Sequence, residues 1–347
     1  MGTPQAISGT IEEKKEQILK FFIVMPAVNT TTAFGAPNFV LVCFTSIRSW
    51  QHWLSIPLVL LFFVAFVSNI TIMSVIQREH ALHEPMYYFL SLLAVFDLGL
   101  CTATTPKILG ILCLDMKVIH STACFLQMYL MNILLGMESA TFLFMAYDRY
   151  IAICNPLRYP TVITTSFVAK ATVFIVLRNA LVILPVPVSA ARLQYCSKIV
   201  VEHCFCTSAA VTALACNDRT FSTLYQLIVA FGLLGSDLIL IVVSYCLILR
   251  VVMTFQGNGA AAKAFSTCSS HLILISFFYT VLLVLIFTAK FEKVIPHDVP
   301  ILLNVLHFLV PPVLNPIVYG VRTTEIKRGI IRMMRNGITE IRCNKFT

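Results

Sequence analysis

Four ionisable side chains interrupt long apolar stretches of this sequence: Asp97, Glu138, Arg178 and Asp237. Such a group costs roughly 2.5–3.5 kcal/mol at the centre of a membrane helix, so it normally faces the protein interior and has a partner. These side chains could bind an ion, water or a ligand, or they could pair with one another. No zinc-spaced His/Cys cluster, phosphate loop or nucleophile elbow is present, which argues against an enzyme.

The segments that carry these groups are long enough to cross a membrane. The chain is 58% hydrophobic and 12% charged, whereas soluble domains are roughly 25% charged. A spanning helix needs about 20 mostly apolar residues. Seven stretches qualify: Leu54–Ile76, Met86–Leu109, Cys124–Tyr150, Phe167–Val188, Thr223–Val251, Ala264–Ala289 and Val299–Gly320. We therefore predict an all-α membrane protein, with a seven-helix bundle over residues 54–320.

The distribution of Lys and Arg predicts the orientation of the chain. Seven spans place the two ends on opposite sides, and more basic residues fall on the C-terminal side. Because cytoplasmic loops carry the excess of Lys and Arg, residues 1–53 should be extracellular and residues 321–347 cytoplasmic. In the tail, apolar residues recur at helical spacing between basic ones from Thr323 to Met334, which predicts an amphipathic helix lying on the membrane.

Residues 145–159 read MAYDRYIAICNPLRY and directly follow the third apolar stretch. Asp148 and Arg149 are adjacent opposite charges, so they belong at the membrane–water boundary, where they can change partners. The string resembles the inner end of the third helix of olfactory receptors, a branch of the rhodopsin-like G-protein-coupled receptors. Further motifs resemble that family in the same order: PMYYFL at 85–90, Ser244-Tyr245, KAFSTCSSH at 263–271 and PPVLNPIVY at 311–319.

The resemblance runs from about Asn29 to about Arg335, and it is closest to class I receptors of family 56. It implies a multi-pass plasma-membrane receptor for a small organic odorant, which activates a stimulatory olfactory G protein and raises cyclic AMP. Asp148, Arg149, Tyr245 and Tyr319 match the positions that change contacts when the sixth helix moves outward. The alternative for both tyrosines is that they only anchor helix ends at the membrane boundary. The basic inner surface would face lipid and the G protein, and no motif indicates nucleic-acid binding.

The resemblance also implies that the odorant lies among helices three, five, six and seven. The apolar candidates on the third helix share a face with Cys124 and Glu138, and Asn132 borders this face and could supply a hydrogen bond; the candidates on the sixth helix share a face with one another. Lys290 stands where some class I receptors carry an arginine that meets a carboxylate, so a carboxylic acid ligand is one expectation. The alternatives are core packing for the apolar side chains and a surface lysine at 290. The candidates are Met128, Met131, Asn132, Leu135, Tyr279, Leu283, Ile286 and Lys290.

Cysteines cluster in a long loop at about 189–222, on the predicted outer side. Four cysteines on this side, Cys124, Cys196, Cys206 and Cys216, could by themselves form bridges in three different combinations. The resemblance implies bridges between Cys124 and Cys206 and between Cys196 and Cys216. Cys43 and Cys204 remain, and the sequence leaves open whether they pair.

Two of the intramembrane carboxylates match family positions. Asp97 and Glu138, together with Asn315, could hold a sodium ion, because hard oxygen ligands suit hard cations. The alternative is that one carboxyl is protonated and hydrogen-bonded. We interpret Arg178 and Asp237 as structural partners of nearby polar groups rather than as ligand sites.

Asn29-Thr-Thr31 is an N-glycosylation sequon on the predicted outer side, whereas Asn69-Ile-Thr71 lies within the first span and should stay unmodified. Residues 1–24 match nothing in the family pattern and could be an upstream extension. They make a poor cleaved signal peptide, because Glu12, Glu13 and Glu16 precede the short apolar run. The first span is therefore expected to direct membrane insertion.

Two other functions fit part of the sequence. A transporter would show internal repeats and helices broken near the midplane, and neither is visible here. The same receptor chemistry could instead sense a metabolite outside the olfactory tissue, which sequence alone does not distinguish from smell.

Overall fold

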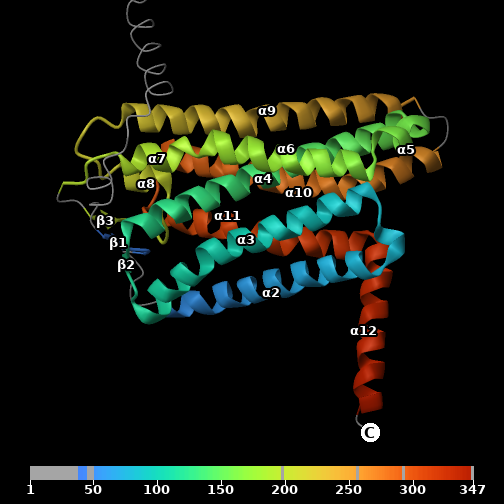
Figure 1. Ribbon diagram of the computed structural model, residues 1–347, viewed down its shortest axis with the longest axis horizontal. Coiled ribbons are helices and arrows are strands. Elements are labelled where there is room, and N and C mark those ends of the chain that lie inside the picture. Colours follow the sequence, from blue (N-terminus) through green and yellow to red (C-terminus); the bar gives the residue numbers. More distant parts are fainter. Residues whose placement is uncertain (1–37, 45–50, 197–198, 255–257, 291–293, 345–347) are drawn as a thin grey trace, which may run out of the picture. The chain divides into compact units, whose positions relative to one another are not determined.

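The computed structural model describes residues 38–44, 51–196, 199–254, 258–290 and 294–344; for Gln51, 258–267, 289–290 and 336–344 it describes the helix but not the side chains. Within these ranges, seven spans of 21–34 residues are long and apolar enough to cross a membrane. This confirms the predicted seven-helix bundle (Figure 1). The spans are α2 (Gln51–Arg78), α3 (Pro85–Leu114), α4 (Ser121–Cys154), α6 (Thr165–Ile183) with α7 (Pro185–Ala191), α9 (Thr220–Val252), α10 (Asn258–Lys290) and α11 (Asp298–Arg322).

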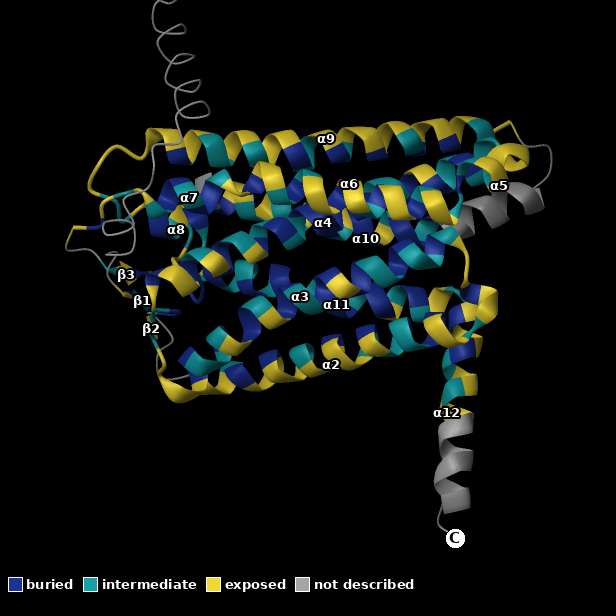
Figure 2. Ribbon diagram, viewed as in Figure 1, coloured by how far each residue is buried: buried dark blue, intermediate teal, exposed yellow. Residues whose placement is uncertain are grey.

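Helix α4 is the central element of the bundle, because it packs against α3, α6, α9 and α10. The most apolar part of α4 is 61% buried, whereas that of α9 is only 17% buried. Figure 2 shows the exposed residues along the outer faces of α9 and α2. Many of these residues are large and apolar, Phe63 and Phe231 among them. Such surfaces suit contact with lipid, since the helices satisfy their own backbone polar groups.

Local sequence signals account for the ends and breaks of the spans. The Thr164 side chain accepts a 3.2 Å hydrogen bond from the backbone N–H of Phe167, so it caps α6. Pro185 divides the fourth span into α6 and α7 because it lacks the N–H that a continuing helix needs. Helix α11 contains Pro311, Pro312 and Pro316 in its interior. The Pro312 carbonyl accepts a 2.8 Å hydrogen bond from Nδ2 of Asn69 in α2, so Asn69 links the first span to the seventh.

A short three-stranded sheet lies at one end of the bundle. Strand β1 (Phe39–Leu41) pairs antiparallel with β2 (Val118–Ile119) and parallel with β3 (Val200–Val201). The chain before the first span thus joins two distant loops, an arrangement that the sequence did not predict. With α8 (Ser208–Thr212), these strands and their loops form what we call the lid, over the described parts of residues 38–44, 117–120 and 192–219.

The opposite end, called the Arg149 end, carries the short turns η1 (His80–Leu82) and η2 (Pro156–Arg158) and helix α5 (Tyr159–Val162). Helix α12 (Thr324–Asn344) follows α11 there and runs across the direction of the spans (Figure 1). Arg332 donates a 2.7 Å hydrogen bond from Nη1 to Oε2 of Glu79, which ties α12 to the end of α2. The predicted tail helix therefore exists, and it continues past Met334 to Asn344.

Candidate functional site

The Asp148–Arg149 pair lies in the last two turns of α4. Nε and Nη2 of Arg149 donate hydrogen bonds of 2.9 and 2.6 Å to Oδ2 of Asp148. The Tyr159 hydroxyl donates a 3.0 Å bond to Oδ1 of the same carboxylate. Asp148 is fully buried, and burial together with this carboxylate raises the pKa of Tyr159. Both oxygens of the carboxylate are thus satisfied, one by α4 itself and one by α5.

Three further polar side chains gather near Arg149 from the other helices. Tyr245 of α9 is buried, and its hydroxyl has no hydrogen-bond partner among the described residues. The Tyr319 hydroxyl of α11 lies 3.3 Å from Nδ1 of His271 on α10. Arg149 interacts electrostatically with all three rings. The predicted coupling residues therefore lie together where α4, α9, α10 and α11 meet. His271 was not predicted from the sequence, although it ends the 263–271 motif.

A second polar group lies deep in the bundle. Nδ2 of Asn315 donates hydrogen bonds of 3.1 and 3.0 Å to the two carboxylate oxygens of Asp97. Glu138 is buried and interacts electrostatically with Asp97, while its Oε1 has no partner among the described side chains. The three residues proposed to hold sodium are thus close neighbours. The part of the chain that is described has no group of three or more His, Cys, Asp or Glu residues placed to hold a metal.

A third polar network crosses four spans. Nη1 of Arg178 on α6 donates a 2.8 Å bond to Oδ1 of Asp237 on α9, and Oγ of Ser139 on α4 donates a 2.9 Å bond to Oδ2. The Ser139 hydroxyl also lies 2.8 Å from that of Tyr279 on α10. Arg178 and Asp237 are therefore partners of each other. Ser139 was not singled out from the sequence, because a serine in an apolar helix carries no distinctive signal.

The predicted ligand face of α4 points into the bundle. Met128 and Met131 are buried in the core beneath the lid, and Leu135 is partly buried. Asn132 donates a 2.7 Å bond from Nδ2 to the Met128 carbonyl, and the same nitrogen lies 3.5 Å from Oγ of Ser208 in α8. Met128, Met131 and Asn132 thus lie where α4 meets the lid, whereas Leu135 packs against a second core cluster that includes Tyr279 of α10.

The predicted ligand face of α10 needs a correction. Tyr279 is buried, but Leu283 and Ile286 are 60% and 45% exposed on the outside of the helix. Tyr279 reaches the α4–α9 boundary, and its hydroxyl lies 3.4 Å from the Leu234 carbonyl of α9. Tyr279 therefore lies at the edge of the buried face of α10. Leu283 and Ile286, which follow it on the same side of the helix, are exposed on the outside of the bundle. Lys290 ends α10, and its side chain lies outside the described residues.

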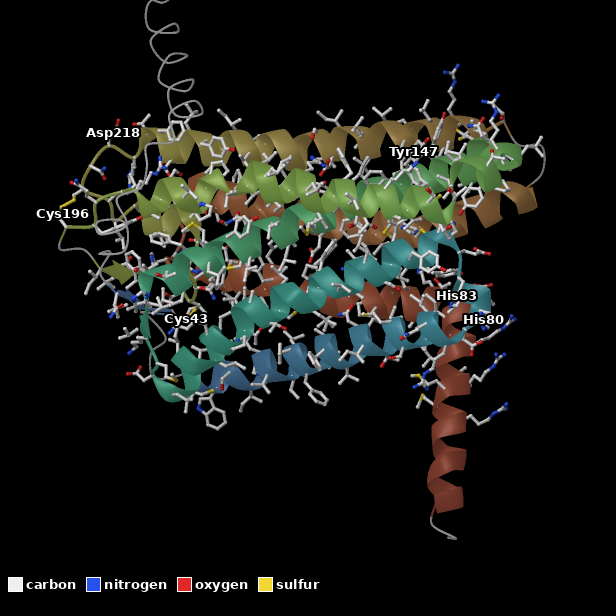
Figure 3. The ribbon with its side chains drawn as sticks, in the orientation of Figure 1. Cys43, His80, His83, Tyr147, Cys196 and Asp218 are labelled. Carbon is white, nitrogen blue, oxygen red and sulfur yellow. A yellow bond between two sulfur atoms is a disulfide. The ribbon has the colours of Figure 1, made fainter. Side chains whose placement is uncertain are left out.

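Three disulfides fasten the lid to the bundle and to itself. Cys124 at the start of α4 bonds Cys206, and Cys196 bonds Cys216, which are the pairings that the family resemblance implied. Cys43 bonds Cys204, which the sequence had left open. Figure 3 shows Cys43 and Cys196 at one end of the bundle and His80 and His83 at the other.

Two residues of the lid region were not anticipated. Gln127 of α4 accepts a 3.1 Å bond at Oε1 from the backbone N–H of Cys206 and donates a 2.9 Å bond to the Ala103 carbonyl of α3. His203 is 6% exposed, and neither ring nitrogen has a hydrogen-bond partner among the described residues. Burial and the nearby His297 lower the pKa of His203 to about 3. The lid thus contains a neutral, buried imidazole.

Asn29 and residues 1–24 lie outside the described residues.

A seven-helix membrane bundle with a disulfide-tied lid at one end and an Asp-Arg pair at the other defines a G-protein-coupled receptor. The olfactory receptor family model matches residues 58–337. Olfactory receptor 56A4 of Homo sapiens is 57% identical over 307 residues, which is 88% of this chain and 98% of that receptor. Olfactory receptor 56A1 of Homo sapiens is 52% identical over 91% of this chain and all of that receptor. The chain therefore belongs to the olfactory receptor family.

Similarity extends beyond the 56 group. Olfactory receptor 51B6 of Homo sapiens is 41% identical over 86% of this chain and 96% of its own length. The fold and the relatives together make this a multi-pass plasma-membrane receptor for odorants that couples to a G protein, and not an enzyme.

Proposed function

We propose that this receptor binds a small organic odorant beneath the lid and activates the stimulatory olfactory G protein, which raises cyclic AMP. The observation that carries the proposal is the cluster around Arg149, where side chains from four spans meet at the end opposite the lid. A ligand shifts a conformational equilibrium only if it binds one state more tightly. Separation of α10 from α4 and α11 would break the His271–Tyr319 contact and open a groove for the G protein.

The proposed orientation places the lid outside the cell and the Arg149 end in the cytoplasm. The disulfides of the lid support this, because disulfides persist in oxidising compartments. The free cysteines Cys154 and Cys268 lie on the spans that carry the Arg149 cluster, which suits a reducing compartment. Glycosylation at Asn29 follows from the same orientation.

For the ligand site, we propose Met128, Met131, Asn132 and Leu135 of α4 with Tyr279 of α10. The methionines are apolar and adaptable, which suits small organic ligands of several shapes. The Asn132 amide is partly buried and adds a polar group that could hydrogen-bond a ligand. Lys290, at the end of α10, would select a carboxylate if the odorant is an acid. Expression in another tissue would make the same site a metabolite sensor.

We also propose a sodium ion at Asp97, Glu138 and Asn315. The residues fit a hard cation because two carboxylates and one amide lie together, and Oε1 of Glu138 has no hydrogen-bond partner among the described residues. When bound, the ion would supply positive charge that offsets the negative charge of the carboxylates. Glu138 is otherwise a buried acid with one unsatisfied oxygen, which is costly in an apolar interior.

A cyclic-AMP reporter screen tests the proposed function. Cells expressing the receptor would be exposed to acids, alcohols, aldehydes and ketones of graded chain length. An active odorant should lose its effect in Arg149→Ala, because the cluster at the G-protein face loses the guanidinium of Arg149. Surface expression should persist, because the Tyr159 hydroxyl still donates a hydrogen bond to Asp148. Arg158→Ala is the matched control, since Arg158 lies in η2 and is exposed. Full signalling by Arg149→Ala would refute the coupling mechanism.

A further inference from the structure

His307 is a polar side chain buried in the membrane-spanning helix α11. It is 2% exposed, and neither nitrogen of its ring has a hydrogen-bond partner among the described residues. The buried His271 of α10 differs, because its Nδ1 lies 3.3 Å from the Tyr319 hydroxyl. A neutral imidazole has one N–H donor and one acceptor nitrogen, and leaving them unpaired in an apolar interior is costly. A molecule bound from outside the chain would supply the partner that His307 needs.

Two aromatic rings place the His307 imidazole between the two core clusters of the bundle. Its ring centroid lies 5.4 Å from that of Phe308, the next residue of α11, and 5.7 Å from that of Phe278 on α10. Phe308 belongs to the cluster beneath the lid, and Phe278 belongs to the second cluster. These clusters include or contact four of the proposed odorant residues: Met128, Met131, Leu135 and Tyr279.

The lid reaches the same region through Phe205. The ring centroid of Phe205 lies 5.2 Å from that of Phe308, with the two rings nearly perpendicular. Phe205 directly precedes Cys206, whose disulfide to Cys124 fixes this part of the lid to α4. An odorant beneath the lid and beside α4 would therefore meet aromatic rings from the lid and α11, with His307 as the neighbouring polar group.

The charges near this region favour a neutral ligand. Cys101 of α3 lies against the same part of α11, because its thiol is 3.8 Å from the Phe308 carbonyl. Cys101 also interacts electrostatically with Asp97 and Glu138, so two acidic side chains are close. A single sodium ion there would leave no positive charge over for a third carboxylate. A neutral oxygen can accept a hydrogen bond from the imidazole without the cost of burying another charge.

We propose that the ring N–H of His307 donates a hydrogen bond to the oxygen of a neutral odorant, an alcohol or an aldehyde with an apolar chain. The chain of the odorant lies against the aromatic rings and the methionines of the cluster beneath the lid. This inference rests on the proposed odorant site, and it adds to that site a residue of α11 and a class of ligand.

The test measures binding to the purified full receptor by thermal stabilisation in detergent. The probes are straight-chain primary alcohols, the aldehydes and the alkanes, each of graded and matched chain length. The wild type should bind an alcohol or an aldehyde more tightly than the alkane of equal length. His307→Phe should weaken that alcohol or aldehyde by roughly tenfold, equivalent to about 1.4 kcal/mol, which is typical of one hydrogen bond. Binding of the alkane should be unchanged, because phenylalanine keeps the ring contacts.

Two further variants control for structure. His307→Gln keeps a donor and an acceptor, so it should retain most of the preference for oxygen. His80→Phe makes the same change as His307→Phe at an exposed position of the Arg149 end, and it should bind every probe as the wild type does. If His307→Phe does not fold, His307→Met replaces it, since methionine also lacks the ring nitrogens.

Three results would overturn the inference. Equal losses for the alcohol and the alkane would mean that His307 only packs the core. An unchanged preference for oxygen in His307→Phe would mean that buried water is the partner of His307. Failure of every alcohol and aldehyde to stabilise the wild type would exclude the class of ligand. In that last case, an odorant of another class that raises cyclic AMP through Arg149 would still support the proposed function.

Discussion

Arg178 of α6 and Asp237 of α9 form a 2.8 Å ion pair inside the membrane-spanning part of the bundle. The Arg178 side chain is 16% exposed and that of Asp237 only 2%. Neither charge has bulk water to solvate it, so each depends on the other. Ser139 and Tyr279 extend the pair to α4 and α10, and four spans thus share one polar network.

Breaking this pair should destabilise the receptor strongly. Arg178→Met leaves a buried carboxylate without its cation, and removing one partner of a buried pair costs about 3–5 kcal/mol. Its thermal midpoint in detergent should fall well below that of the wild type. The double variant Arg178→Met/Asp237→Leu should recover much of the loss, since apolar pairs often replace buried ion pairs without penalty. Lys170→Met, at an exposed position of α6, is the control. Additive losses in the double variant would mean that the two residues do not stabilise each other.

The Cys124–Cys206 bridge should behave as one unit. Cys124→Ser and Cys206→Ser each remove the same bond, and losing a native disulfide costs roughly 2–5 kcal/mol. Each single variant should therefore be retained in the endoplasmic reticulum, and the double variant should be no worse. Surface staining measures this, with Cys113→Ser, at an exposed free thiol, as the control. Clearly additive losses would argue against the bridge.

Acidification should destabilise the lid through His203. Its pKa is about 3 in the folded receptor and about 6.5 when unfolded. The contribution of His203 to the free energy of unfolding is therefore complete above about pH 6.5. It is lost as the pH falls toward 3, because only the unfolded chain binds the proton readily. Between pH 7 and pH 5 the loss should be about 2 kcal/mol.

Thermal unfolding of the wild type and of His203→Phe at both pH values measures this loss. The phenylalanine should remove much of the pH dependence, because it cannot take up a proton and its ring can keep the contact with Phe205. His80→Phe, at an exposed position of the Arg149 end, should leave it unchanged. An unaltered pH dependence in His203→Phe would show that other groups are responsible.

Lys290 should matter only for acidic odorants. A hydrogen bond between an ammonium group and a carboxylate contributes about 1.5–3 kcal/mol, so Lys290→Gln should weaken an acid agonist by roughly 10–100-fold. Lys290→Arg should keep most of the response. Cyclic-AMP dose–response curves for an acid and for a neutral agonist measure the difference. Equal losses for both agonists would assign Lys290 a structural role.

The sequence alone determined the seven spans, because each needs only a local run of apolar residues. It also determined the family, because the Asp148–Arg149 string and four further motifs are local patterns. The intramembrane charges could also be recognised from the sequence, because the free-energy cost of placing a charged side chain in a bilayer depends on the residue type alone. Tertiary structure was needed to choose their partners: Arg178 meets Asp237 across 59 residues of sequence.

Contacts between distant segments decided the rest. Cys43 and Cys204 are 161 residues apart in the sequence. They form a disulfide because β1 runs beside β3. Leu283 and Ile286 share a face with Tyr279, but helical spacing gives only relative directions. The rotation of α10 within the bundle turns these two residues outward.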